Sequence, residues 1–111
     1  MNVIENEIRD AIEKELCGAN ERFPLFASAH EAIAVIAEER DEAHNELISV
    51  ELFWKYAWDA VKANNLKSAY DFIARMKFAA ERLAIEACQV AAMCEKAFQS
   101  RDVKEDEKGA E

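Results

Sequence analysis

The sequence predicts an all-α protein, and three observations support this fold class. Two glycines and one proline in 111 residues leave long stretches of chain without a helix breaker. Alanine and glutamate, which both favour helices, are among the most frequent residues. Apolar side chains recur at intervals of three and four residues, which places them on one face of a helix. We therefore expect a bundle of four helices.

The first helix is expected from about Val3 to Leu16. Its narrow apolar stripe repeats every four residues and comprises Ile4, Ile8, Ile12 and Leu16. Gly18 is a natural stop just beyond it. The loop that follows, residues 21–26, contains the only proline and three large apolar side chains. Such a loop is expected to contact either the bundle or a ligand.

A capping box formed by Ser28 and Glu31 predicts the start of the second helix. No glycine or proline interrupts the chain from there to Lys62. Residues 48–50 are the weakest helical stretch and predict a bend, so that a third helix carries residues 52–58. The pair at residues 64 and 65, both asparagine, predicts the turn that follows.

The fourth helix is expected from about Leu66 to Phe98. At a rise of about 1.5 Å per residue it is about 50 Å long, which exceeds what a domain of this size needs for its own core. The charged residues 100–111 have little to bury and are expected to be disordered. Residues 1–99 are therefore expected to form one domain.

Composition and charge bear on partners and location. Hydrophobic residues make up 51% of the chain, a high share for a small domain, so we expect a homodimer or homotetramer that buries the excess. The formal net charge of -9 repels a phosphate backbone and argues against nucleic-acid binding. The acidic beginning and the short apolar runs argue against a signal peptide and a membrane span. We therefore expect a cytoplasmic protein with no membrane partner.

Two carboxylates, Glu39 and Glu86, occupy positions where the helical pattern calls for a core residue. A charge inside an apolar stripe is costly unless something compensates it. Glu42, one turn beyond Glu39, adds a second charge, and Gln89 offers an oxygen three residues after Glu86. Hard divalent cations such as magnesium take oxygen ligands of this kind. The pattern predicts a magnesium site, although acidic pairs at this spacing are also frequent on solvated helix faces.

The chain resembles a known family in three segments. Residues 22–31 (Arg-Phe-Pro-Leu-Phe-Ala-Ser-Ala-His-Glu) and residues 36–43 (Ile-Ala-Glu-Glu-Arg-Asp-Glu-Ala) resemble the MazG-like proteins of phages and mobile elements. Residues 86–93, together with Lys96, are similar to the second signature helix of that family. The MazG family belongs to the all-α nucleoside triphosphate pyrophosphohydrolases. The resemblance implies a helical homo-oligomer that uses magnesium to cleave NTPs or dNTPs into a monophosphate and pyrophosphate.

The resemblance also implies roles for individual residues. Glu39 and Glu42 match the first pair of family metal ligands, and Glu86 matches the third. Gln89 stands where typical members have aspartate, so the fourth ligand brings no charge and magnesium affinity should fall. Manganese is an expected substitute for magnesium. Glu38 or Glu42 is expected to orient or deprotonate the attacking water. The alternative is a nucleotide-binding or regulatory oligomer with weak or no turnover.

Four further residues are candidates for binding the rest of a nucleotide. His30, Trp54 and Trp58 offer rings that stack on a base, and Lys55 offers a cation for phosphate. Each also has a simpler interpretation. Trp54 and Trp58, four residues apart, suit a core or subunit contact, Lys55 suits a solvated face, and His30 suits an exposed helix start.

Overall fold

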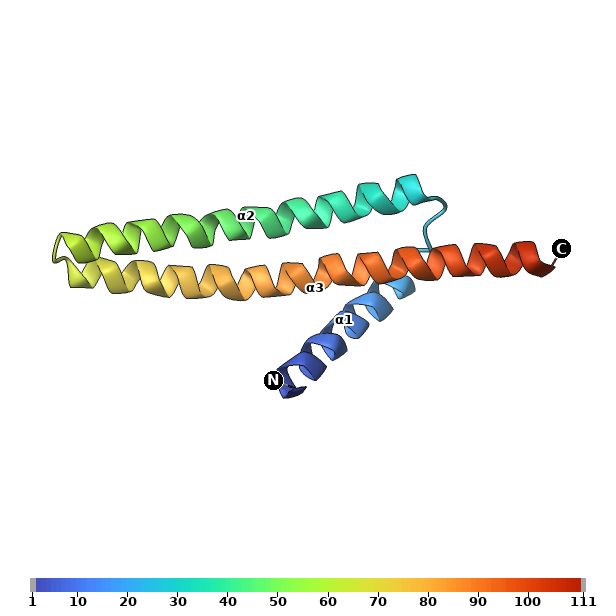
Figure 1. Cartoon of the computed structure of the whole chain (residues 1–111), viewed down its shortest axis with the longest axis horizontal. Helices are drawn as coiled ribbons and strands as arrows, with labels where there is room; N and C mark the ends of the chain where they lie inside the picture. Colours follow the sequence, from blue (N-terminus) through green and yellow to red (C-terminus); the bar gives the residue numbers. More distant parts are fainter. Residues whose placement is uncertain (1, 111) are drawn as a thin grey trace. The chain divides into compact units, whose positions relative to one another are not determined.

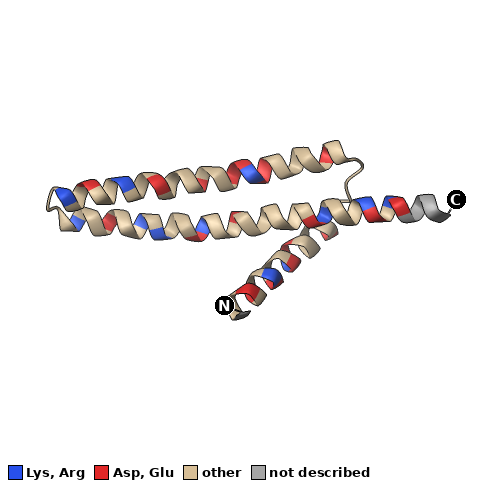
Figure 2. Cartoon of the chain, in the orientation of Figure 1, with Lys and Arg blue, Asp and Glu red and all other residues tan. Residues whose placement is uncertain are grey.

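A computed structural model describes the backbone of residues 2–110 and the side chains of residues 3–105. Within this range it contains three α-helices and no strand: α1 (Asn2–Arg22), α2 (Ala29–Lys62) and α3 (Leu66–Ala110) (Figure 1). The predicted all-α class is confirmed. Each of the three helices carries both acidic and basic residues (Figure 2). No helix in the described part of the chain is both long enough and apolar enough to cross a membrane.

Helix α1 continues past the stop expected at Gly18. That residue remains helical, and its carbonyl accepts a hydrogen bond from Arg22 Nε at 3.2 Å. The helix ends instead at Arg22, just before Phe23 and Pro24. A proline ring disfavours the helical conformation of the residue before it, so the chain leaves the helix there. The end predicted near Leu16 was therefore too early.

Helix α2 begins where the capping box predicts. Ser28 Oγ accepts a hydrogen bond from the Glu31 N–H at 3.1 Å, and the helix starts at Ala29. The bend expected at residues 48–50 is absent, because α2 runs unbroken for 34 residues. Ser49 Oγ donates to the Asn45 carbonyl at 3.3 Å, so its hydroxyl is satisfied inside the helix. Two expected helices are thus one, and the described chain has three helices where four were expected.

The turn between α2 and α3 lies at the predicted asparagines. Asn64 adopts a left-handed conformation with φ of 58°, and its N–H donates to the Val61 carbonyl at 3.0 Å. The Asn65 N–H donates to the Ala60 carbonyl at 2.9 Å, which completes a Schellman motif. Asn65 Oδ1 then accepts the Ser68 N–H at 3.2 Å and caps the start of α3.

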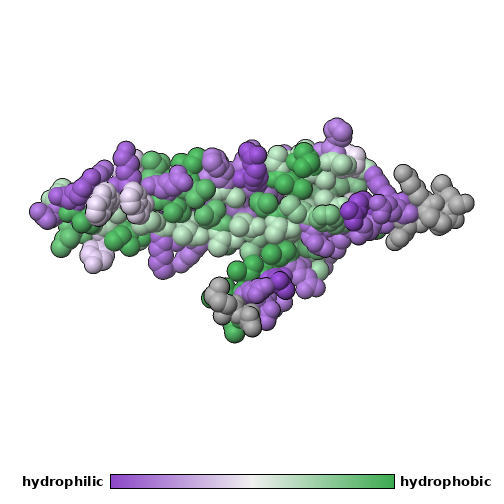
Figure 3. Space-filling model, in the orientation of Figure 1, coloured by the Kyte–Doolittle hydropathy of each residue, from purple (hydrophilic) through white to green (hydrophobic). Residues whose placement is uncertain are grey.

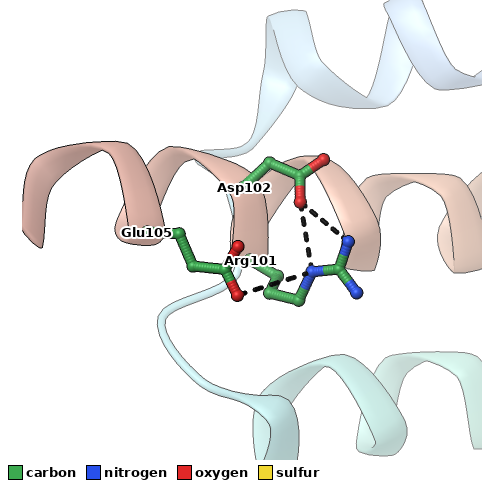
Figure 4. Close-up of polar contacts among 3 residues, drawn as sticks. All are labelled: Arg101, Asp102 and Glu105. Atoms are coloured by element: carbon green, nitrogen blue, oxygen red, sulfur yellow. Dashed lines mark hydrogen bonds and ion pairs between the residues drawn. The ribbon is translucent and has the colours of Figure 1, made fainter. Parts of the chain in front are cut away.

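Helix α3 extends to Ala110, whereas disorder was expected from residue 100. Arg101 lies at the start of this extension (Figure 4). Its Nη2 and Nε contact Asp102 Oδ1 at 2.9 and 3.1 Å, and its Nε lies 4.0 Å from Glu105 Oε1. The hydrogen bond to Asp102 and then the nearby negative charges raise the pKa of Arg101 above its ordinary value. Opposite charges one turn apart favour helix, and Ser100 just before them is buried.

The chain forms two compact units. The first contains the residues up to Arg40 and those from Ala87 on, and the second contains Asp41–Glu86. The apolar residues buried in the first unit are Leu16, Phe26, Ala32 and Ala92. Those buried in the second unit are all alanines, namely Ala57, Ala69 and Ala79.

Alanines let the two helical segments of the second unit approach closely, but larger apolar side chains remain on its surface. Tyr70 is 69% exposed and Phe78 is 61% exposed. The space-filling view shows apolar residues exposed on the visible face of α2 and α3 (Figure 3). Exposed apolar area of this extent is typical of a surface that another chain covers.

Candidate metal centre

The second unit brings two of the predicted ligands together. Glu42 on α2 and Glu86 on α3 each offer a carboxylate oxygen, and these atoms lie within 4.8 Å of each other. Glu42 is exposed, whereas Glu86 is half-buried. Leu83, one turn earlier on α3, is also half-buried, and Ala79 before it is buried. Glu86 therefore lies on the same inward face of α3 as these two apolar residues, as the apolar stripe predicts.

Glu39 lies one turn before Glu42 on the same unbroken helix. It is half-buried. Oxygens that share a magnesium ion lie about 2.1 Å from it, and hence at most about 4.2 Å apart. The carboxylate oxygens of Glu42 and Glu86, within 4.8 Å of each other, lie close to this limit. The donor set, oxygen only and anionic, suits magnesium.

An ion pair adjoins these carboxylates in the second unit. Arg82 Nε on α3 donates to Glu46 Oε1 on α2 at 2.9 Å. The hydrogen bond to Glu46 and then its charge raise the pKa of Arg82, and the charge of Glu86 raises it further. Arg82 therefore stays positively charged and offsets part of the negative potential around Glu86.

Sequence reasoning missed this pair. Glu46 lies one turn after Glu42, and Arg82 lies one turn before Glu86. Two helices joined by a tight turn carry opposite charges one turn beyond the predicted ligands. This pattern was the signal that could have predicted the ion pair.

The first unit contains a cavity of about 510 Å³ lined by three of the predicted site residues, Glu38, Glu39 and Gln89. Glu38 is exposed, and Gln89 is half-buried. The cavity also has apolar walls formed by Phe23, Pro24, Phe26, Val35, Ala92 and Met93. A pocket with apolar walls and a few polar groups is the usual form of a small-molecule site.

The same cavity contains a buried lysine. Lys96 is 2% exposed, and its Nζ lies 5.0 Å from the centroid of the Phe26 ring. The Phe26 N–H donates to Ser100 Oγ at 2.9 Å, and that hydroxyl donates to the Lys96 carbonyl at 2.8 Å. These bonds tie the loop to α3 and hold the ring beside the ammonium. Of the two contacts expected for this loop, the bundle or a ligand, the structure shows the contact with the bundle.

The candidate base-stacking and phosphate residues lie elsewhere. Trp54 and Trp58 are exposed and stack on each other with ring centroids 6.5 Å apart, next to exposed Lys55. Trp54 follows Glu42 by 12 residues on α2, which is about 18 Å along the helix. His30 is exposed in the first turn of α2 and is not among the described residues that line the cavity. The two tryptophans and Lys55 are therefore not brought to Glu42 within the second unit.

The carboxylate oxygens near Glu42 are of the kind that can hold a divalent cation. Comparison of the chain with protein-family models, curated proteins and solved structures finds no match.

Proposed function

We propose that the chain is a magnesium-dependent nucleoside triphosphate pyrophosphohydrolase of the MazG-like class. It converts an NTP or dNTP into the monophosphate and pyrophosphate. The observation that carries the proposal is the pair of carboxylates from Glu42 and Glu86, whose oxygens lie within 4.8 Å of each other in the second unit, with Glu39 one turn before Glu42. Carboxylate oxygens gathered in this way are the ligands that magnesium takes.

The negative charge of the chain explains why a metal ion has to mediate the contact between the protein and a triphosphate. With a formal net charge of -9, the protein repels a free triphosphate. Magnesium, when bound, supplies the positive charge that neutralises the phosphates. Glu39, Glu42 and Glu86 hold it through carboxylate oxygens, and Gln89 contributes its amide oxygen.

The chemical step needs one proton acceptor. Glu38 or Glu42 orients a water molecule and takes its proton. The water oxygen forms a bond to the α-phosphorus, while the bond from that phosphorus to the bridging oxygen of the β-phosphate breaks. Pyrophosphate leaves with the electron pair of the broken bond, and the monophosphate remains.

A second candidate function is favoured by Gln89. A neutral amide at the fourth ligand position leaves three formal negative charges around the metal. The affinity of the site for magnesium is therefore lower than with four. In this alternative the chain is a helical nucleotide-binding or regulatory oligomer that binds a nucleotide without turnover.

We also propose that the chain works as a homodimer or homotetramer. The buried apolar residues of the second unit are alanines, and aromatic residues such as Tyr70 and Phe78 stay exposed. Two copies that cover these surfaces would bring together segments of α2 and α3 from each chain in a bundle of four helices, two from each copy.

Pyrophosphate release from a panel of NTPs and dNTPs, measured with magnesium, tests the proposal. We expect release by the wild type and a loss of at least about 100-fold in Glu39→Ala, because the metal loses a ligand. Glu51→Ala is the matched control, since Glu51 is an exposed glutamate on the same helix. Equal rates in all three proteins would contradict the proposal. Calorimetric binding of a non-hydrolysable NTP with no pyrophosphate release would support the alternative.

A further inference from the structure

The apolar stripe of α1 is only partly covered by its own chain. Leu16 is buried and Ile12 is half-buried, whereas Ile8 is 47% exposed and Ile4 is 60% exposed. These four residues recur at every fourth position and share one face of the helix. The stripe is therefore packed at one end of α1 and uncovered at the other. An amphipathic helix with such a face is a typical ligand for an apolar groove.

The first unit also contains a groove of this kind. A cavity of about 460 Å³ is lined mainly by the first two turns of α2 and by α3 from Ala97 on. Ile33 and Phe98 line it and remain 66% and 53% exposed. Ala32 and Ile36 add further apolar surface. Large apolar side chains left exposed around a groove mark a surface that another helix can cover.

The chain's own α1 lies on a different side of α3. No residue of α1 is among the described residues that line the groove. Asn20 Nδ2 of α1 donates instead to Gln99 Oε1 at 3.0 Å, and a separate cavity is lined by α1 residues together with Ala91, Glu95 and Gln99. Gln99 and Phe98 are successive residues, so they project about 100° apart around α3. The groove is therefore open to a helix from another chain.

The charges of the two surfaces are complementary. Residues 3–10 of α1 contain three acidic side chains and one basic side chain, which gives a formal charge of -2. The groove is lined by two cations, Arg101 and Lys104, and by one carboxylate, Glu105, which gives a formal charge of +1. Opposite charges favour the approach of two surfaces and fix their register. The acidic, apolar start of α1 thus matches the groove in both charge and hydrophobicity.

We infer that α1 of one copy docks into this groove of a second copy. Ile4 and Ile8 of the first copy pack against Ile33 and Phe98 of the second, and the acidic residues of α1 face Lys104. Because each copy has both the helix and the groove, the exchange is reciprocal and a two-fold axis closes it. This contact is separate from the one proposed for the second unit, and it does not rest on the proposed enzymatic function.

Disulfide formation between two separately expressed full-length chains tests the inference. In both chains the three native cysteines are replaced by alanine; one chain carries Ile8→Cys and a ¹⁵N label, and the other carries Ile33→Cys. A disulfide forms only when two Cα atoms come within about 7 Å, so mild oxidation should link the two chains into a mixed dimer that mass spectrometry identifies. Asn6→Cys, at an exposed position on the opposite face of α1, replaces Ile8→Cys in the control and should give at least about fivefold less mixed dimer.

Charge reversal tests which surfaces meet. Lys104→Glu in the Ile33→Cys chain should lower the yield of mixed dimer about threefold, and Glu7→Lys in the Ile8→Cys chain should restore it. The two charges are on different chains, so a restored yield can come only from a contact between copies. Lys67→Glu, at an exposed lysine of the second unit, is the matched control and should leave the yield unchanged. Circular dichroism checks that each chain keeps its helices.

Four results would overturn the inference. The first is no mixed dimer from the Ile8→Cys and Ile33→Cys chains, which would leave the groove to a different protein. The second is an equal yield with Asn6→Cys, and the third is a yield that Lys104→Glu leaves unchanged. The fourth is a disulfide that closes within a monomeric chain carrying both cysteines, which would assign the groove to its own α1. Since no nucleotide or magnesium is present, none of these results bears on pyrophosphate release.

Discussion

At the scale of single residues, the charge around Glu86 separates the two functions that we propose, hydrolysis of a nucleotide and binding without turnover. Gln89 contributes an oxygen without a charge, one turn after Glu86. Arg82, one turn before Glu86, keeps a positive charge, because Glu46 and Glu86 raise its pKa. Both residues reduce the negative potential that a magnesium ion would meet in the proposed site.

Replacing Gln89 with aspartate should strengthen magnesium binding. The new carboxylate adds a charge beside Glu86, and we expect about tenfold tighter binding by calorimetry, equivalent to about 1.4 kcal/mol. Gln99→Asp is the control for an extra charge on the same helix, because Asn20 Nδ2 donates to Gln99 Oε1 at 3.0 Å and aspartate also accepts such a bond. Weaker magnesium binding in Gln89→Asp would remove Gln89 from the site.

At the scale of elements, local signals predicted the helix starts and the turn well. Ser28 caps α2, and Asn64 and Asn65 end one helix and begin the next, because each acts through backbone groups within a few residues. The absent bend at residues 48–50 shows where weak propensity misled, since a long helix tolerates a few poor residues.

The candidate site likewise has features that could be predicted from the sequence and features that could not. The i, i+3 spacing of Glu39 and Glu42 and the apolar stripe that contains Glu86 were visible in the sequence. The contact between Phe26 and Ser100 was not, because it joins residues 74 apart in the chain. No local pattern encodes that pairing, so the buried position of Lys96 beside Phe26 emerges only from the fold.

The bond between the loop and α3 gives a stability prediction. Ser100→Ala leaves the buried Phe26 N–H without its acceptor, and we expect a loss of about 1–3 kcal/mol in the free energy of unfolding by urea denaturation. Ser49→Ala is the control, since its hydroxyl only returns to a carbonyl of its own helix. Equal stability of the Ser100→Ala protein and the wild type would show that the contact does not hold the loop.

At the scale of the whole molecule, the exposed apolar side chains are the main observation. The described core contains few large residues, while Trp54 and Trp58 are 59% and 51% exposed. Burying such rings between copies stabilises an assembly by roughly 25 cal/mol per Å² of apolar surface. The proposed homo-oligomer would bury the excess of apolar residues noted in the sequence.

Sedimentation tests this assembly. We expect the wild type to sediment as a dimer or tetramer and Trp58→Glu to shift toward monomer, because a buried charge at the contact has no partner. Lys67→Glu, which changes charge at an exposed polar position of the same unit, should sediment as the wild type does. A monomeric wild type at micromolar concentration would refute the homo-oligomer.

The most direct test of the proposed metal chemistry is anomalous diffraction from crystals grown with manganese in place of magnesium. We expect a manganese peak bound by carboxylate oxygens of Glu39, Glu42 and Glu86. Loss of that peak in Glu42→Gln, with the fold unchanged, would assign it to this site. Wild-type crystals with no peak between Glu42 and Glu86 at millimolar manganese would contradict the proposal.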